Sequence, residues 1–293
     1  MEDLTGLGHV ATAVASVANN IIDKVSNAVG IMYTDSNYKM KKDAMGKLYE
    51  KIVEYEEIDE FSKAAIISNL QQELKHYNNQ RAVLERTINM VDESIDISTV
   101  DDDWIAFFFD KVKNISSEEM QFFWSKVLSE EFNKPNSIPK SLIHTLSCID
   151  LKVAKTFNNL CQFAVKNITD DEEVIFFKQI CCPKEVDISF SSLKELERYG
   201  LIALNDYADF VYKELNGYMV FEVNGNNLTV YGNDKNEVPF GDIFLTLDGR
   251  ALCKCIEKKN NVQLEDMFLT ILTSCTVEKN NQGTKVVPFI MAG

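Results

Sequence analysis

The chain has 293 residues, of which 45% are hydrophobic and 10% aromatic, so it can bury a sizeable core and does not have the composition of a disordered protein. Its formal net charge of −15 excludes a general nucleic-acid coat, because Lys and Arg supply most of the affinity for phosphate backbones. The seven cysteines include no Cys-x-x-Cys pair, which argues against a disulfide framework and against a structural zinc site.

Residues 1–34 stand apart as a predicted helix rich in small residues. Residues 4–22 carry no formal charge and are about long enough to cross a bilayer, but their many small and polar side chains make them only moderately hydrophobic. Glu2 and Asp3 stand where a secretory signal would have basic residues. We therefore expect a cytoplasmic body, held at the cytoplasmic face of the inner membrane.

Two stripes run along this predicted helix. An apolar seam repeats at spacings of three and four residues, as in a coiled coil: Leu7, Val10, Val14, Val17 and Ile21. A polar stripe lies on another face: Thr12, Ser16, Asn20, Asp23 and Asn27. Small residues between the stripes would let helices approach closely. The pattern predicts either a membrane or pore-like helix that oligomerises around a wet centre, or an ordinary helix of a soluble bundle.

Residues 35–100 are predicted to form a long helical stalk or a helical hairpin. Apolar residues recur at helical spacing from Ile52 to Leu84, with charged residues between them, and a break is expected near residues 57–60. Tyr33 and Tyr38 could lie at a lipid headgroup interface, where aromatic side chains are enriched. The alternative, which is the commoner case, is a solvated start of a helix.

Residues 101–170 are predicted to form a helical bundle. The aspartates before Trp104 should cap the helix that begins there, and Ser116 should cap the next helix. A further helix is expected over residues 150–166. Trp104 and Trp124 lie on apolar helix faces, so we expect both in the core rather than stacked on a nucleotide.

Residues 171–293 are predicted to form a winged-helix-like α+β region. A helix over residues 190–199 should end at Gly200 and lead into a strand. Asn224-Gly225 lies between two alternating segments and predicts a tight hairpin, and Asp248-Gly249 is interpreted as a turn between a strand and a helix. The predicted fold is thus mainly α, with an N-terminal amphipathic oligomerisation helix, a long helical region and a helical bundle, followed by this small α+β part.

The sequence contains no recognisable catalytic or metal-binding motif. The three histidines lie in no catalytic or metal-binding pattern: His9, His76 and His144. We therefore expect a protein that is not an enzyme and that uses no metal and no cofactor, with a hydrolase whose site is dispersed in sequence as the remaining alternative. Four basic residues are the candidates for binding an anionic ligand: Lys126, Lys140, Arg198 and Arg250.

Several short motifs give the chain a resemblance to a bacterial family known only as a domain of unknown function. They are Asp103-Trp104-Ile105, the Glu-Glu-Met-Gln-x-x-Trp run that ends at Trp124, the turn from Glu131 to Pro135, and Gly200-Leu201-Ile202, with residues 28–33 as an opening segment. The resemblance covers roughly residues 25–255 and implies the fold more than the function. Family members tend to have Gly and then Arg after the proline, whereas this chain has Asn136 and Ser141, which counts against an anion site there.

The chain is also similar to the effector of the Hailong anti-phage defence system, which implies a membrane-acting oligomer held inactive by a nucleotide or oligonucleotide. We therefore expect a ligand-gated, pore- or channel-like effector of bacterial antiviral defence. Its partners would be its own copies, the inner membrane and the inhibitory ligand, with no general binding of duplex DNA. The alternative is a soluble scaffold or regulator that binds a protein partner through the C-terminal α+β region.

Overall fold

The computed structural model describes residues 5–33, 35–92, 94–181, 186, 188–213, 217–280 and 288–289. Among these, side chains are described from Ser16 onward, except those of Asp35, Tyr38, Asn280, Pro288 and Phe289. The chain divides into two compact units, Met1–Ser147 and Cys148–Gly293. The first unit is helical and the second combines helices with antiparallel strands, which confirms the predicted fold class. The helix predicted near residue 150 belongs to the second unit rather than to the first.

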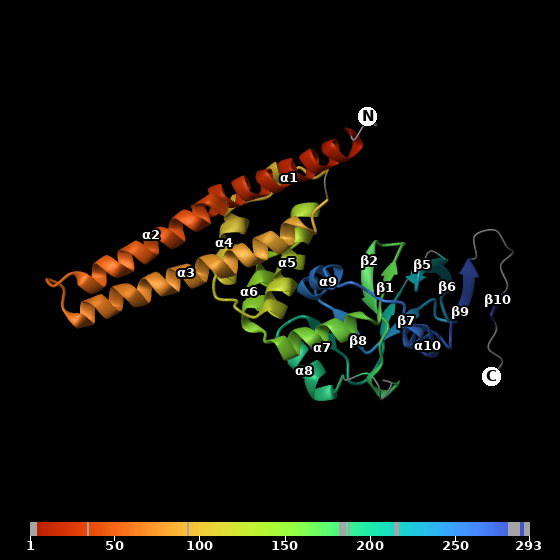
Figure 1. The fold of residues 1–293 in the computed structure, drawn as a ribbon. Coiled ribbons are helices and arrows are strands. Elements are labelled where there is room, and N and C mark those ends of the chain that lie inside the picture. The colour runs from red at the N-terminus through yellow and green to blue at the C-terminus, as the bar shows by residue number, and fades with distance from the viewer. Residues whose placement is uncertain are drawn as a thin grey trace. The chain divides into compact units, whose positions relative to one another are not determined.

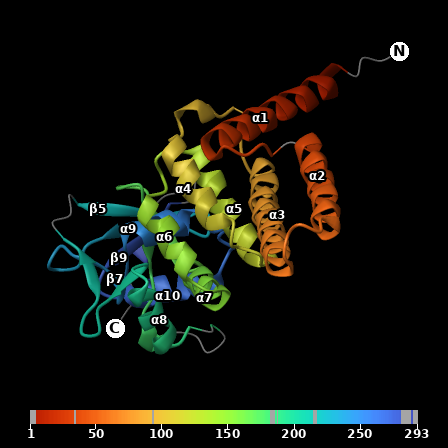
Figure 2. The same ribbon diagram turned by 90° about the vertical axis from the view of Figure 1, so that its left-hand side faces the viewer.

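The first unit consists of helices of very different length. They are α1 (Thr5–Val29), α2 (Asp35–Glu54), α3 (Glu60–Ile88), the short 3-10 helix η1 (Ile97–Thr99), α4 (Asp102–Val112), α5 (Glu118–Asn133) and α6 (Lys140–Cys148). Helices α2 and α3 run side by side as a long hairpin, and the connection between them lies far from α4, α5 and α6 (Figures 1 and 2). The predicted stalk is therefore a helical hairpin.

Side-chain caps set where these helices begin. The Asp59 carboxylate accepts a hydrogen bond from the Ser62 N–H (2.9 Å), so α3 begins at Glu60 and the expected break is confirmed. The Asp101 carboxylate accepts from the Asp103 N–H (2.8 Å), which confirms an aspartate cap in front of Trp104. Carboxylates at these positions also interact favourably with the positive end of the helix dipole.

The prediction that Ser116 caps α5 is wrong by one residue. Ser117 is the cap, and its hydroxyl accepts from the Met120 N–H. The Ser116 hydroxyl has another partner, because it accepts a hydrogen bond from the Asn79 side-chain amide of α3 (3.3 Å). Two adjacent serines satisfy the same local rule, and only the contact with α3 decides which of them caps the helix.

The core of the first unit is aromatic and includes both tryptophans, as predicted. The Phe108 ring lies between them, with its centroid 5.2 Å from that of Trp104 and 5.2 Å from that of Trp124. The Trp104 indole N–H donates to the Ile138 carbonyl (2.8 Å). Aromatic pairs at these separations add to the stability that burial of their large surfaces provides.

A buried glutamate organises the turn after α5. The two carboxylate oxygens of Glu131 accept hydrogen bonds from the backbone N–H groups of Asn136 (2.7 Å) and Ile138 (2.8 Å). Burial raises the pKa of this carboxyl, and the backbone donors oppose that rise. Asn136 has φ of 66°, a left-handed conformation that Gly adopts most easily. The Glu-to-Pro motif is therefore a structural turn.

The second unit contains four helices of at least eight residues, several short strands and one 3-10 helix in its described part. They are α7 (Leu151–Cys161), β1 (Ala164–Asn167), β2 (Glu172–Ile175), η2 (Gln179–Cys181), α8 (Phe190–Arg198), β3 (Ile202–Leu204), β4 (Phe210–Tyr212), β5 (Tyr218–Val223), β6 (Asn226–Tyr231), β7 (Val238–Gly241), β8 (Ile243–Leu245), α9 (Leu247–Lys254), α10 (Val262–Ile271), β9 (Thr276–Asn280) and β10 (Pro288–Phe289).

The strands form one six-stranded sheet, in the order β10-β9-β6-β5-β1-β2, and two pairs, β3-β8 and β4-β7. The predicted hairpin is confirmed: β5 and β6 are joined by Asn224 and Gly225, both with positive φ, as a type I′ turn requires. Phe268 of α10 packs on the sheet, with its ring 4.4 Å from that of Phe176 and 5.8 Å from that of Phe221.

Two local predictions in this unit are wrong. The helix expected over residues 150–166 ends at Cys161, and residues 164–167 form β1, because they pair with both β2 and β5. Asp248-Gly249 is not a turn, since α9 already begins at Leu247. Gly249 is needed for another reason: a Cβ atom there would clash with the Leu201 carbonyl oxygen.

Candidate functional site

The candidate site is built by the N-terminal helices, beginning with the way α1 is attached to its own unit. Ile21 and Val25 are fully buried, and α1 lies against α4. The Lys24 ammonium group forms an ion pair with the Asp102 carboxylate (2.6 Å) at the start of α4. The C-terminal half of α1 is therefore fixed by apolar packing and by one charge pair.

The predicted apolar seam has two parts, one at the attachment to α4 and one before it. Its last member, Ile21, is buried inside the chain, and Val17 is half-buried. Leu7, Val10 and Val14 lie outside the described side chains. The seam thus serves internal packing near its C-terminal end, whereas contact of its earlier part with lipid or with other copies stays a prediction.

The predicted polar stripe faces solvent wherever it is described. The exposed members are Ser16, Asn20, Asp23 and Asn27. Thr12 lies outside the described side chains. Packing and polarity therefore divide the visible part of α1 into two faces, with the apolar residues inside and the polar ones outside.

The junction between α1 and α2 is held by two tyrosines. The Tyr33 hydroxyl donates to the Gln80 side-chain oxygen (3.0 Å), and the Tyr77 hydroxyl donates to the Met32 carbonyl (2.9 Å). The two rings stack at 5.5 Å, and burial raises the pKa of Tyr33. The expectation that Tyr33 lies at a lipid headgroup interface is wrong, because its ring is packed against α3 and α4.

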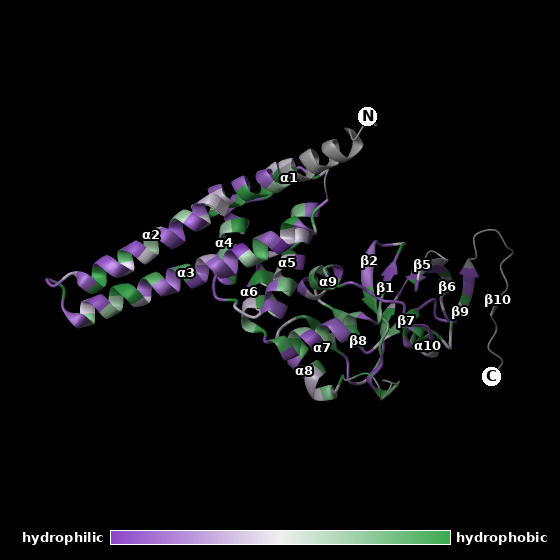
Figure 3. Ribbon diagram, viewed as in Figure 1, coloured by the Kyte–Doolittle hydropathy of each residue, from purple (hydrophilic) through white to green (hydrophobic). Residues whose placement is uncertain are grey.

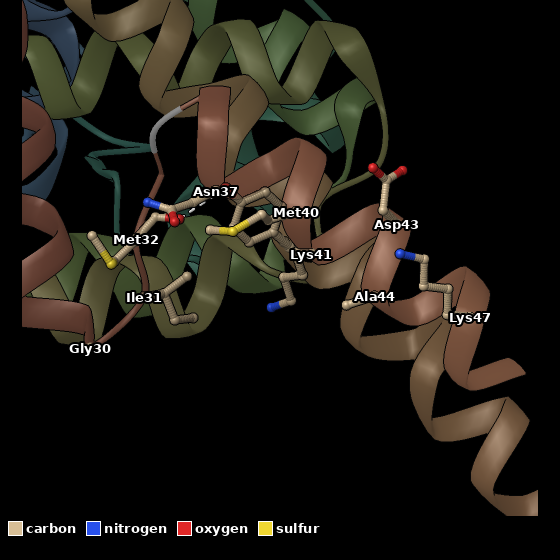
Figure 4. A pocket seen from close by; sticks show the side chains of 10 residues that line it. Gly30, Ile31, Met32, Asn37, Met40, Lys41, Asp43, Ala44 and Lys47 are labelled. Carbon is tan, nitrogen blue, oxygen red and sulfur yellow. Dashed lines mark hydrogen bonds between the residues drawn. The ribbon is translucent and has the colours of Figure 1, made fainter. Parts of the chain in front are cut away.

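A groove of about 700 Å³ opens beside this junction. Figure 4 shows Gly30, Ile31 and Met32 lining it from the connection after α1, with Met40 and Lys41 facing it from α2. The Lys41 ammonium group lies over the Tyr77 ring, 4.8 Å from its centroid, which is a cation–π contact. An apolar floor with a lysine at its edge can accept an apolar segment that carries an acidic group.

The outer part of the α2–α3 hairpin presents apolar side chains to solvent. Eight large hydrophobic side chains between residues 32 and 66 are exposed: Met32, Met40, Leu48, Tyr49, Val53, Tyr55, Phe61 and Ile66. Phe61 is 84% exposed. Hydrophobic and hydrophilic residues are interspersed along both helices (Figure 3). The sequence analysis did not predict this surface. The signal for it was the presence of apolar residues outside the predicted apolar stripe of a lysine-rich helix.

The four basic residues predicted to bind an anionic ligand each have a neighbour of their own. Lys140 lies 3.8 Å from the Asp101 carboxylate, and Arg198 lies 3.6 Å from the Glu195 carboxylate. Arg250 pairs with Glu172, and Lys126 lies over the Phe122 ring. Lys126 and Lys140 belong to the first unit and the two arginines to the second. The contacts of these four residues therefore define no shared anion site.

The described part of the chain contains no candidate metal site and no candidate membrane-spanning helix. Among those residues, no group of three or more His, Cys, Asp or Glu side chains is arranged to hold a metal ion. Within the same residues, no helix combines the length and the hydrophobicity needed to cross a bilayer.

The cysteines differ in accessibility, and this leads to a prediction for thiol chemistry. Cys161 and Cys253 are buried, whereas Cys148 and Cys181 are exposed. Burial raises the pKa of the Cys161 thiol, and the neighbouring Cys253 thiol raises it further. Since the thiolate is the reactive form, iodoacetamide should modify the buried pair about 100-fold more slowly than the exposed pair in the native protein. Peptide mass spectrometry over time measures the rates. Equal rates for the two pairs in the native protein would contradict the assignment of Cys161 and Cys253 as buried.

The comparisons with known proteins concern the sequence as a whole. No curated protein and no solved structure matches the chain. One family model matches residues 66–268, which include most of α3, the aromatic core, the Glu131 turn and most of the second unit. The range matched by the family model leaves out α1, α2 and the tip of the hairpin, which form most of the candidate site. The match covers more than half of the chain, so the chain belongs to the family of proteins of unknown function called DUF2806.

Proposed function

We propose that this protein works by self-assembly, with α1 and the α2–α3 hairpin making the contacts between copies. The observation that carries the proposal is the row of exposed apolar side chains along the hairpin. Large apolar surface on a protruding element marks an interaction site, because leaving it in water forgoes its burial energy.

Charge favours a second copy of this chain as the partner. Helix α2 has five Lys and four Asp or Glu residues, a net charge of +1, and α3 has four Lys or Arg and three Glu residues, again +1. The whole chain has a net charge of −15. Copies that meet through their hairpins bring together the parts that repel least, whereas most other surfaces would bring acidic groups face to face.

A double change in the hairpin tests this assembly. Leu48→Glu with Val53→Glu should weaken association by at least about tenfold, because each buried leucine or valine contributes about 1.5–3 kcal/mol and 1.4 kcal/mol corresponds to tenfold. Light scattering after gel filtration over a concentration series measures it. Leu247→Glu, which changes a 78% exposed residue in the second unit, is the matched control and should assemble like the wild type.

Comparing the melting temperatures of the double variant and the wild type separates loss of assembly from loss of folding. Both altered residues are exposed, so the free energy of unfolding should change by no more than about 0.5 kcal/mol. A wild-type protein that stays monomeric up to millimolar concentration would remove the proposal, and so would a double variant that assembles normally.

A membrane-directed role is the more specific form of the proposal. It is supported by the lack of charge in residues 4–22, by the exposed polar stripe and by the resemblance to an anti-phage effector. In that role the protein would be a bacterial defence effector, controlled by a bound nucleotide or oligonucleotide. While Ile21 and Val25 stay packed on α4, residues 5–20 would reach only about 24 Å, short of the roughly 30 Å hydrocarbon core. Crossing a bilayer would therefore require release of α1 from α4.

The alternative is a soluble scaffold or regulator that binds a partner through its second unit. A liposome flotation experiment with anionic vesicles separates the two. Membrane-directed oligomers should rise with the vesicles, whereas a scaffold should stay at the bottom of the gradient at every protein concentration.

A further inference from the structure

The second unit has a pocket of about 560 Å³ that none of the observations above explain. Its walls are apolar, with Ile180 from η2, Phe190 and Leu193 from α8, and Leu204 from β3. Ile180 is 87% exposed and Phe190 is 51% exposed, so two large apolar side chains stand in water at the pocket. The volume lies within the usual range for sites that bind small molecules or single side chains.

The polar part of the pocket is provided by Gln179, Asn205, Asp206 and Asp242, of which Asp206 is paired with Lys194. One Asp242 carboxylate oxygen, Oδ2, accepts a hydrogen bond from the Gln179 backbone N–H (3.0 Å), and the Asp242 N–H donates to the Phe177 carbonyl (3.1 Å). This approach of two backbones depends on Gly241, which has φ of 108° and where a Cβ atom would clash with the Phe177 carbonyl oxygen. The Asp242 carboxylate is thus held firmly in place.

Two acceptor atoms at this position lack hydrogen bonds. Within the part of the chain that the structure describes, the buried atoms Asp242 Oδ1 and Gln179 Oε1 have no partner. Buried polar atoms are nearly always hydrogen-bonded, and a lost partner costs about 1–3 kcal/mol, more for a charged group. Both atoms are acceptors, so the missing groups must be donors.

The nearby basic residues are already engaged by other acids. Lys178 binds the Asp209 carboxylate (2.9 Å). Lys194 binds Asp206 and Glu197, each at 3.2 Å. Among the described residues no ion pair includes Asp242, so its carboxylate has no direct cationic partner there.

We propose that this pocket binds a cationic group on an apolar stem, an alkylguanidinium or alkylammonium. Its N–H donors would bind Asp242 Oδ1 and Gln179 Oε1, and its stem would lie against Ile180, Phe190 and Leu204. Guanidinium and ammonium groups carry donors and no acceptor, so they can satisfy the free oxygens and neutralise the carboxylate at the same time. A phosphate or carboxylate ligand would be repelled. The same chemistry occurs in free alkylamines and in Arg or Lys side chains of a peptide.

Titration of the full-length protein with n-butylguanidinium, n-butylammonium and the neutral isostere n-butylurea tests the proposal. Calorimetry should show binding of the two cations and at least tenfold weaker binding of the urea. Asp242→Asn should lower the affinity for both cations at least tenfold. Asp234→Asn removes an exposed acid from the same unit with the same change in net charge, and it should bind like the wild type.

A second variant covers the case in which Asp242→Asn does not fold. Phe190→Ala removes an exposed wall residue, so it should keep its melting temperature and bind n-butylguanidinium several-fold more weakly. A Leu-Arg-Leu peptide amide that binds tighter than n-butylguanidinium would assign the site to a peptide side chain, and the reverse order would assign it to a free amine. The proposal would be overturned if the urea bound as well as the cations, or if Asp242→Asn bound them with full affinity. It would also be overturned if guanosine bound more tightly than the cations, or if neither cation bound at millimolar concentration.

Discussion

Replacing Trp124 by Ala should lower the free energy of unfolding by about 3–5 kcal/mol, the largest stability change expected in this chain. The Trp124 side chain is fully buried and packs edge-on against Phe108, so the variant leaves a cavity in the middle of the first unit. Domains are usually stable by only about 5–15 kcal/mol, so the variant should lose a large part of its stability. Urea denaturation followed by circular dichroism measures the loss.

Conservative changes at the two tryptophans sharpen this prediction. The Trp124 indole N–H is buried and has no hydrogen-bond partner among the described residues, so Trp124→Phe should cost much less than the alanine change. Trp104→Phe should cost more than Trp124→Phe, because it removes the donor to the Ile138 carbonyl. An alanine variant at Trp124 that melts like the wild type but loses ligand binding would show instead that this indole binds ligand.

Local structure followed from the sequence wherever a local interaction decides it. The break near residues 57–60, where Asp59 caps α3, and the cap at Asp101 depend on side chains that bond to N–H groups two or three residues away. The Asn224-Gly225 turn depends on residues that adopt positive φ easily. Each of these features needs only a few neighbouring residues, so the sequence pattern was enough to predict them.

Features that depend on distant contacts could not be predicted in the same way. Residues 164–167 form a strand because two other strands flank them, and their own composition does not distinguish strand from helix. Ser117 rather than Ser116 caps α5 because Asn79, far away in sequence, occupies the other hydroxyl. The groove beside Tyr77 and the pocket at Asp242 arise from segments that come together only in the fold.

The same reasoning explains the partial success at the N-terminal helix. Its two-stripe pattern predicted a face for packing and a face for water, and the described residues follow it. The pattern carried no information about which surface the seam would pack on. For Ile21 that surface is α4 of the same chain, whereas the pattern is equally compatible with lipid or a second copy.

The division of α1 into an attached half and an earlier half leads to the last prediction. Val14→Asp places a charge on the predicted seam before the attachment, at a cost of about 2.5–3.5 kcal/mol if the residue enters the centre of a bilayer. If the membrane-directed proposal holds, expression of the wild-type chain should depolarise cells, and Val14→Asp should relieve this while the melting temperature stays unchanged. A membrane-potential dye at matched expression levels measures the effect.

Two other aspartate changes on α1 serve as controls for this experiment. Ser16→Asp adds the same charge on the exposed polar stripe and should depolarise cells as the wild type does. Ile21→Asp should instead destabilise the whole first unit by several kcal/mol, because it buries an unpaired carboxylate against α4. Loss of activity without loss of folding should therefore occur at position 14 and not at position 21. If wild type and Val14→Asp affect cells alike and neither is found in the membrane fraction, the effector proposal fails and the scaffold alternative takes its place.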